Sequence, residues 1–256
     1  MAIHPTAIID PKAKIDSSAE IGAYAIIGGN VEIAAGCKIA PHASIDHCRL
    51  GERTRVGTHT VLGGDPQMLN WKEVPSLVVI GKDVWIHELV TIHRGMYENG
   101  VTSIGDRCMI MSNSHIAHDC DFHNDVIYTT LSGVAGHVTI EEFAIISAEV
   151  GIHQHVRIGA YAMVGGMSRI VQDVVPFMMV EGSPAKIRTT NAIGLKRKGF
   201  SKEARDNIRR AFKVLFQSGL STSSAVEELK KLDDSNGVIK RIIDFIGNSK
   251  RGITGG

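Results

Sequence analysis

Three features of the sequence predict an all-β parallel solenoid followed by a small α-helical C-terminal domain. An aliphatic residue recurs at every sixth position through most of the chain, a small residue often follows it, and a helical pattern replaces the repeat after Val180. Self-similarity at a fixed period is typical of repeat architectures. We therefore assign residues 1–184 to the solenoid and residues 185–256 to the α-helical domain, with the boundary at Ser183-Pro184.

The repeat begins with eight isoleucines spaced six residues apart, from Ile3 to Ile45. It slips by one residue at Leu50 and continues, with two interruptions, to Ile170. An α-helix cannot align every sixth residue, because its period is 3.6 residues. Short parallel strands joined by tight glycine-containing turns can, and they stack the aliphatic side chains inside the solenoid. A β-sandwich is disfavoured, since it would show period-two alternation and longer turns.

This pattern resembles the left-handed parallel β-helix, or hexapeptide solenoid, family. In that family three hexads form one coil, so about eighteen residues advance the stack by roughly 4.8 Å. Two segments interrupt the hexads, and we predict insertion loops at residues 63–79 and 97–103. Loops on a rigid scaffold commonly carry specificity, although a surface loop without a role is the alternative.

The C-terminal region combines helical periodicity with a concentration of positive charge. Hydrophobic residues at helical spacing run from Ile208 to Phe216 and from Ile239 to Ile246, and Ser224 is a candidate cap for a short helix between them. Ten basic and two acidic residues lie between Lys186 and Lys213, a local charge of +8. Such a field attracts an acidic partner or phosphates, unless it is only a solvated helix face.

Composition excludes several classes of protein. An apolar fraction of 43% with 21% charged residues is not that of a disordered chain, and a net charge of +1 argues against a nucleic-acid binder. The four cysteines form no CxxC pair, which favours a reducing compartment. We see no secretory signal and no apolar stretch long enough to be a transmembrane segment, so we expect a cytoplasmic protein.

Histidines are the strongest candidates for chemistry. His118 and His137 are nineteen residues apart, His137 and His155 eighteen, and His118 and Gln154 thirty-six. On an eighteen-residue coil these positions climb one region of the solenoid. Clustered imidazoles bind a metal or supply a general base, and the spacing alone leaves both open.

Several motifs together resemble the UDP-N-acetylglucosamine acyltransferase family, whose members begin lipid A synthesis. The similarity runs nearly end to end and includes the long insertion. The motifs are Thr91-Ile92-His93-Arg94-Gly95, His115-Ile116-Ala117-His118-Asp119-Cys120, Ala135-Gly136-His137-Val138, Ile152-His153-Gln154 and Gly194-Leu195-Lys196-Arg197-Lys198-Gly199-Phe200.

The resemblance implies transfer of a 3-hydroxyacyl chain from acyl carrier protein to the 3-position of a UDP-N-acetylglucosamine-type sugar. His118 would be the general base, Asp119 would orient it, and the Gly136 N–H would stabilise the oxyanion. Gly166 matches the position that limits acyl length. In all, eight further residues would bind substrates: Gln67, His115, His137, His153, Gln154, Gly166, Asn191 and Arg197.

The resemblance also implies a homotrimer with its site between subunits, and acyl carrier protein as a partner of the basic helices. The acyl donor would be carried on the phosphopantetheine of that protein, with no bound cofactor and no metal. The sequence departs from the family where Met68 replaces an aspartate, Asn70 a lysine and Ile193 a glutamate. The acceptor is therefore either the 3-hydroxyl sugar or a 3-amino UDP-sugar, and Asp65 is a candidate substitute for the missing aspartate.

Two other classes of protein remain as alternatives. Metal-dependent carbonic anhydrases share the β-helix and bind zinc through three histidines across a subunit interface, but they lack a long basic helical appendage. A non-enzymatic scaffold does not explain the grouped histidines.

Overall fold

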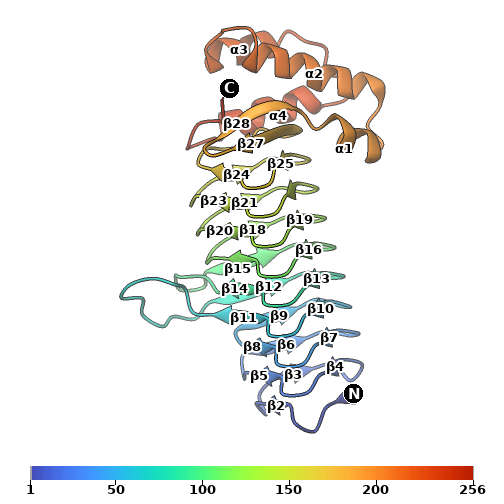
Figure 1. Cartoon of the computed structure of the whole chain (residues 1–256), viewed down its shortest axis with the longest axis vertical. Helices are drawn as coiled ribbons and strands as arrows, with labels where there is room; N and C mark the ends of the chain where they lie inside the picture. The colour runs from blue at the N-terminus through green and yellow to red at the C-terminus, as the bar shows by residue number, and fades with distance from the viewer. Residues whose placement is uncertain (1, 256) are drawn as a thin grey trace.

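The computed structural model describes residues 2–255 and shows a long solenoid of short strands with helices at its C-terminal end (Figure 1). The strands form three parallel sheets. Sheet 1 contains β1 (Ala2–Ile3), β4 (Glu20–Ile21), β7 (Lys38–Ile39), β10 (Arg55–Val56), β13 (Trp85–Ile86), β16 (Met109–Ile110), β19 (Ile127–Tyr128), β22 (Ile145–Ile146), β25 (Met163–Val164), β27 (Met178–Gly182) and β28 (Ala185–Thr190). Sheet 2 contains β2 (Ile8–Ile9), β5 (Ile26–Ile27), β8 (Ser44–Ile45), β11 (Val61–Gly64), β14 (Thr91–His93), β17 (His115–Ile116), β20 (Gly133–Val134), β23 (Gly151–Ile152) and β26 (Arg169–Ile170). Sheet 3 contains β3 (Lys14–Ile15), β6 (Val31–Ile33), β9 (Cys48–Leu50), β12 (Leu77–Ile80), β15 (Val101–Ile104), β18 (Asp121–Phe122), β21 (Thr139–Ile140) and β24 (Arg157–Ile158).

The predicted β-helix is confirmed by burial and register. The repeated aliphatic side chains are buried and pair with their counterparts one coil away, as Ile27 does with Ile45. Stacking these side chains removes apolar surface from water, which contributes about 25 cal/mol per Å². The core is therefore a column of branched aliphatic side chains along the solenoid axis.

The strand register gives the number of residues that each insertion adds to its coil. Ala2 pairs with Glu20, which gives an eighteen-residue coil. Arg55 pairs with Trp85, thirty residues on, so the first insertion adds 30 − 18 = 12 residues. Trp85 pairs with Met109, twenty-four residues on, so the second adds 24 − 18 = 6.

The predicted loops at 63–79 and 97–103 therefore extend too far at their C-terminal ends. Their starts also differ, because residues 63–64 belong to β11 and the second loop begins at residue 94, directly after β14. Residues from Leu77 and from Val101 already belong to strands, because four-residue stretches there pair across sheet 3. The irregular segments are 65–76, named here the first insertion, and 94–100, named the second insertion.

The predicted boundary at Ser183-Pro184 also needs correction. Residues 185–190 form β28, which pairs antiparallel with β27 and completes sheet 1, because Ile187 and Thr190 are buried there. The helices are α1 (Ala192–Arg197), α2 (Lys202–Phe216), α3 (Thr222–Leu229) and α4 (Val238–Gly247). Ser221 rather than Ser224 caps α3, since its hydroxyl accepts the Ser224 N–H.

Within residues 2–255, no helix is long and apolar enough to cross a membrane. The longest, α2, is amphipathic and buries Ala204, Ile208, Ala211 and Phe212 against its neighbours. These helices lie over the C-terminal end of the solenoid (Figure 1).

Candidate functional site

Both insertions leave the solenoid at the corner between sheets 2 and 3, and the predicted catalytic residues lie at the same corner. A cavity of about 810 Å³ opens there. The insertions contribute Gln67, Met68, Met96 and Tyr97 to its wall. Of the predicted site residues, the cavity brings together Gln67, His115, His118, Gly136, His137, His153 and Gln154.

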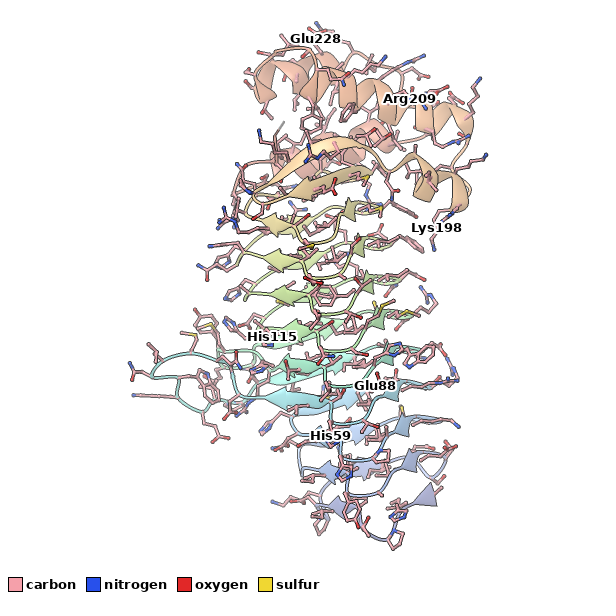
Figure 2. All side chains as sticks on the ribbon, in the orientation of Figure 1. His59, Glu88, His115, Lys198, Arg209 and Glu228 are labelled. Carbon is pink, nitrogen blue, oxygen red and sulfur yellow. The ribbon has the colours of Figure 1, made fainter. Side chains whose placement is uncertain are left out.

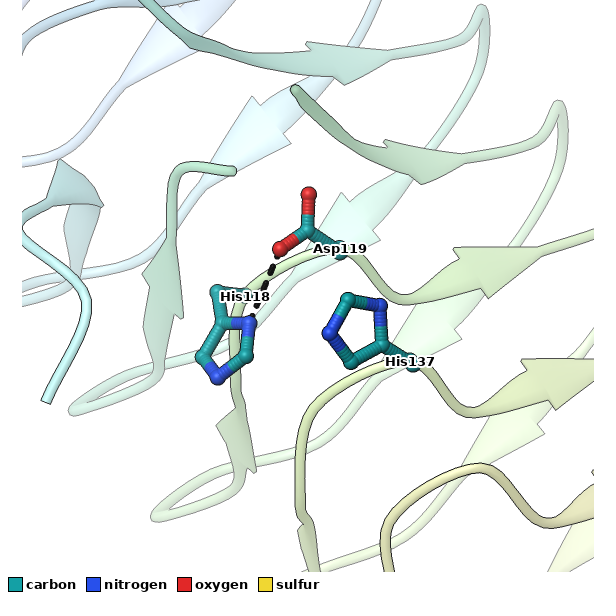
Figure 3. A group of neighbouring side chains, drawn as sticks. All are labelled: His118, Asp119 and His137. Carbon is teal, nitrogen blue, oxygen red and sulfur yellow. Dashed lines mark hydrogen bonds and ion pairs between the residues drawn. The ribbon is translucent and has the colours of Figure 1, made fainter. Parts of the chain in front are cut away.

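His118 and Asp119 form a hydrogen-bonded pair at this corner. The Nδ1 of His118 lies 2.9 Å from Oδ2 of Asp119 (Figure 3), and their side chains are 15% and 13% exposed. The Asp119 backbone is in the left-handed region, with φ +56°, and its N–H donates to the buried Thr102 hydroxyl at 2.8 Å. A carboxylate on Nδ1 keeps the imidazole proton there and leaves Nε2 as a base.

Gly136 packs directly against the His118 ring. A Cβ at position 136 would lie 2.3 Å from His118 Cε1 and 2.6 Å from Nε2, so no other residue fits without moving the ring. This contact was not predicted, although the spacing of the two residues in the sequence indicates it. Gly136 is eighteen residues after His118, and one coil therefore separates them.

The predicted histidines do not form one column of five, which corrects the interpretation of their spacing. His137 stacks on His155 at 4.7 Å between ring centroids, whereas His118 meets His137 edge-on at 5.1 Å. The reason is that eighteen residues separate His137 and His155, but nineteen separate His118 and His137. His137 and His155 stack because one full coil separates them.

A second histidine pair lies on sheet 2. His115 Nδ1 is 2.8 Å from the Thr91 hydroxyl, and its ring meets His93 edge-on at 5.1 Å. Burial lowers the pKa of both His115 and His93 below the usual value, so both are uncharged at neutral pH. His93 also lines the cavity and was not among the predicted site residues, although it lies in the motif at residues 91–95.

His118, Asp119 and His137 also offer ligand atoms within 4.8 Å of one another (Figure 3). Only two of these three residues are histidines, and His118 Nδ1 already faces Asp119 Oδ2 at 2.9 Å. This geometry fits a hydrogen-bonded base better than the three-histidine zinc site of the carbonic anhydrases.

Three predicted substrate-binding residues lie away from the cavity of this chain. Asn191 is 7% exposed and caps α1, where its side chain accepts the Gly194 N–H and donates to the Tyr161 carbonyl at the corner between sheets 3 and 1. Arg197 is exposed on α1, and Gly166 lies at the corner between sheets 1 and 2. The resemblance assigns these residues to substrate binding, but none of the three lines the cavity of this chain.

Asp65 does not replace the missing aspartate. Its carboxylate pairs with Arg94, with Oδ1 2.7 Å from Nη2, and the residue is not part of the cavity wall. Met68 does line the cavity and is 44% exposed. The altered position in the first insertion therefore faces the site.

Comparison with known proteins identifies the same family as the motifs. The family model "Udp N-acetylglucosamine O-acyltransferase; Domain 2" matches residues 173–254, and a model of the GMPPB C-terminal domain matches residues 3–99. The acyl-[acyl-carrier-protein]–UDP-N-acetylglucosamine O-acyltransferase of Burkholderia orbicola (strain MC0-3) is 44% identical over 209 residues, which is 80% of each chain.

Solved structures agree over almost the whole chain. The UDP-N-acetylglucosamine acyltransferase of Francisella novicida superposes with a TM-score of 0.96 at 36% identity, covering 99% of this chain and 94% of that one. The enzyme from Moraxella catarrhalis superposes with a TM-score of 0.95 at 40% identity, covering 99% and 100%. Sequence, fold and motifs therefore lead to one conclusion: the chain belongs to the UDP-N-acetylglucosamine O-acyltransferase family.

Proposed function

We propose that this protein transfers a 3-hydroxyacyl group from the thioester of acyl carrier protein to the 3-hydroxyl of UDP-N-acetylglucosamine, the first step of lipid A synthesis. The observation that carries this proposal is the hydrogen bond of Asp119 to His118, which lines a large cavity, in a chain of this family. That the reaction takes place in the cytoplasm stays a prediction.

In the proposed mechanism, His118 Nε2 removes the proton from the sugar 3-hydroxyl as its oxygen attacks the thioester carbonyl carbon. Asp119 stabilises the imidazolium that forms. The tetrahedral intermediate collapses to the ester, the carbon–sulfur bond breaks, and the imidazolium returns its proton to the leaving thiolate. Among residues 2–255 no group accepts the Gly136 N–H, which supports its role as a donor to the oxyanion.

We further propose a homotrimer in which a neighbouring subunit completes each site. The positions of Asn191, Arg197 and Gly166 outside the cavity of their own chain support this assembly. Exposed apolar side chains also follow sheet 2 and its corner with sheet 1, where a partner would cover them. They include Ile8, Ile26, Leu131 and Met167.

The basic helices are the proposed surface for acyl carrier protein, which brings the acyl chain on its own phosphopantetheine. Lys198 and Arg209 project from this end of the molecule (Figure 2). Arg209 pairs with Asp206 at 2.7 Å, whereas Arg210 is exposed and has no ion-pair partner among the described residues. Arg210 is thus the better-placed cation for an acidic protein partner.

A 3-amino UDP-sugar is the second candidate acceptor, and the composition of the cavity wall favours it. Met68 lies where the family has an aspartate, and none of the described residues of the wall carries a carboxylate. Methionine cannot accept a strong hydrogen bond from a sugar hydroxyl.

The test is to incubate the purified protein with acyl carrier proteins of several chain lengths and either UDP-N-acetylglucosamine or its 3-amino analogue. An ester at the 3-position supports the proposal, and a strong preference for the amide product assigns the second acceptor. Absence of both products with every donor would refute acyl transfer by this site.

A further inference from the structure

Asp119, a turn residue between β17 and β18, is held by the second insertion. The Met96 N–H donates to Oδ2 of Asp119 at 3.0 Å, and this is the same oxygen that faces His118 Nδ1. The other oxygen lies close to Gly100, where a Cβ would be 2.8 Å from Oδ1. Both carboxylate oxygens are therefore contacted by, or packed against, the main chain of residues 94–100.

Met96 is in turn held by the first insertion. The indole Nε1–H of Trp71 donates to the Met96 carbonyl at 3.0 Å. One residue of the second insertion thus accepts from Trp71 through its carbonyl and donates to Asp119 through its N–H. These two hydrogen bonds connect the two insertions to the His118–Asp119 pair.

A buried cation fixes Trp71 in its place. Arg94 is 2% exposed, and its guanidinium carbon lies 4.9 Å from the centroid of the Trp71 ring. The same guanidinium pairs with Asp65 at 2.7 Å and donates to the Val74 carbonyl at 3.3 Å. A stacked guanidinium with two further partners restrains the ring that it covers.

This arrangement has a direct consequence for the base. A carboxylate that can rotate presents either oxygen, or neither, to the imidazole. Asp119 instead receives a fixed peptide N–H on one oxygen and meets the glycine backbone beside the other. Its orientation toward His118 therefore depends on where Met96 sits.

We propose that Trp71 is a positioning residue of the acyltransfer reaction. Through the Met96 peptide it holds the Asp119 carboxylate on His118 Nδ1, so that the imidazole proton stays on Nδ1 and Nε2 faces the substrate. The proposal rests on the proposed function of His118 and Asp119 and assigns a catalytic consequence to the contact between the two insertions.

The test uses Trp71→Phe, which keeps an aromatic ring under Arg94 and removes the indole N–H. Trp85→Phe is the matched control, because Trp85 is the second tryptophan and lies on β13 in sheet 1. We expect kcat to fall about 2- to 10-fold in Trp71→Phe, the effect of one lost hydrogen bond, with both KM values within about twofold. Trp85→Phe should keep the wild-type kcat.

The decisive measurement is ¹⁵N NMR of histidine-labelled protein, with the His118 signals assigned by their loss in His118→Ala. The wild type should show the Nδ1–H tautomer at neutral pH, and Trp71→Phe should show a mixture of tautomers. Gly100→Ala leaves Trp71 intact but crowds Asp119 Oδ1, so it should change the same His118 signals. This second variant tests the dependence of His118 on the Asp119 orientation even if Trp71→Phe fails to fold.

A folded Trp71→Phe protein with wild-type kcat and unchanged His118 nitrogen signals would overturn the proposal, and so would unchanged signals in Gly100→Ala. Failure of the proposed function is distinguishable from this result. In that case His118→Ala itself would retain acyl transfer, whatever Trp71→Phe did.

Discussion

Replacing Gly136 by alanine should displace the His118 ring without removing any functional group. The added Cβ would lie 2.3 Å from His118 Cε1, whereas ordinary contact begins at 3.4 Å, so the ring must retreat by about 3.4 − 2.3 = 1.1 Å. A misplacement of about 1 Å can cost about 10²-fold in rate. We therefore expect kcat to fall roughly 10- to 100-fold, with much smaller changes in KM.

The assay is steady-state acyl transfer by purified Gly136→Ala, with thermal unfolding to confirm that the protein folds. Gly247→Ala is the matched control, since a Cβ at that position meets nothing within 4 Å and the residue ends α4, far along the chain from the cavity residues. Gly247→Ala should keep the wild-type rate.

A double-mutant cycle separates this contact from other roles of Gly136. Once His118→Ala has removed the ring, Gly136→Ala has nothing to displace and should cost little more. A folded Gly136→Ala protein within about threefold of wild type would refute the reasoning. Equal losses in the presence and absence of the His118 ring would refute it too.

Three further predictions concern the acceptor, the donor and pH. Met68→Asp should raise kcat/KM for UDP-N-acetylglucosamine by about 2- to 10-fold if a carboxylate there accepts the sugar hydroxyl, and kinetics with both acceptors will show whether it does. Arg210→Glu should raise KM for acyl carrier protein in a salt-dependent way and leave KM for the nucleotide sugar unchanged, whereas unchanged donor kinetics would make this helix face merely solvated. Because burial holds the pKa of His115 below its usual value, the unfolded chain binds more protons there just below pH 6.5, so stability should fall as the pH decreases through that range. Urea unfolding at pH 7.5 and 5.5 should show a smaller loss for His115→Asn than for wild type, and an equal loss would contradict the neutral assignment.

The solenoid could be predicted from sequence because its periodicity is directly physical. One aliphatic residue per hexad must point inward, and Ile21 and Ile27 do so. The slip at Leu50 appears in the structure as a seventeen-residue coil, since Lys38 pairs with Arg55. The insertions were located correctly, but their ends were not. Their last residues re-enter sheet 3 before the hexad pattern resumes, so no repeat marks where each loop stops.

Only those site contacts that join residues one eighteen-residue coil apart could be predicted from the sequence. A spacing of eighteen residues places Gly136 against His118 and His137 against His155. The spacing of nineteen between His118 and His137 does not lead to stacking, although the sequence analysis expected it. No periodic signal could reveal that Met96 contacts Asp119, because the path of an irregular insertion is set by contacts such as Trp71 with Met96. No periodic signal could place Asn191 and Arg197 relative to the cavity, because both lie beyond the last hexad, on α1 and at its N-cap.

We propose that the imidazole of His118, held by Asp119, is the base for acyl transfer. Its most direct test is the turnover of purified His118→Ala with acyl carrier protein thioester and UDP-N-acetylglucosamine, beside wild type. Loss of a general base predicts that kcat falls by about 10²- to 10⁴-fold in a protein that folds and still binds the nucleotide sugar. A folded His118→Ala protein that turns over at the wild-type rate would contradict the account.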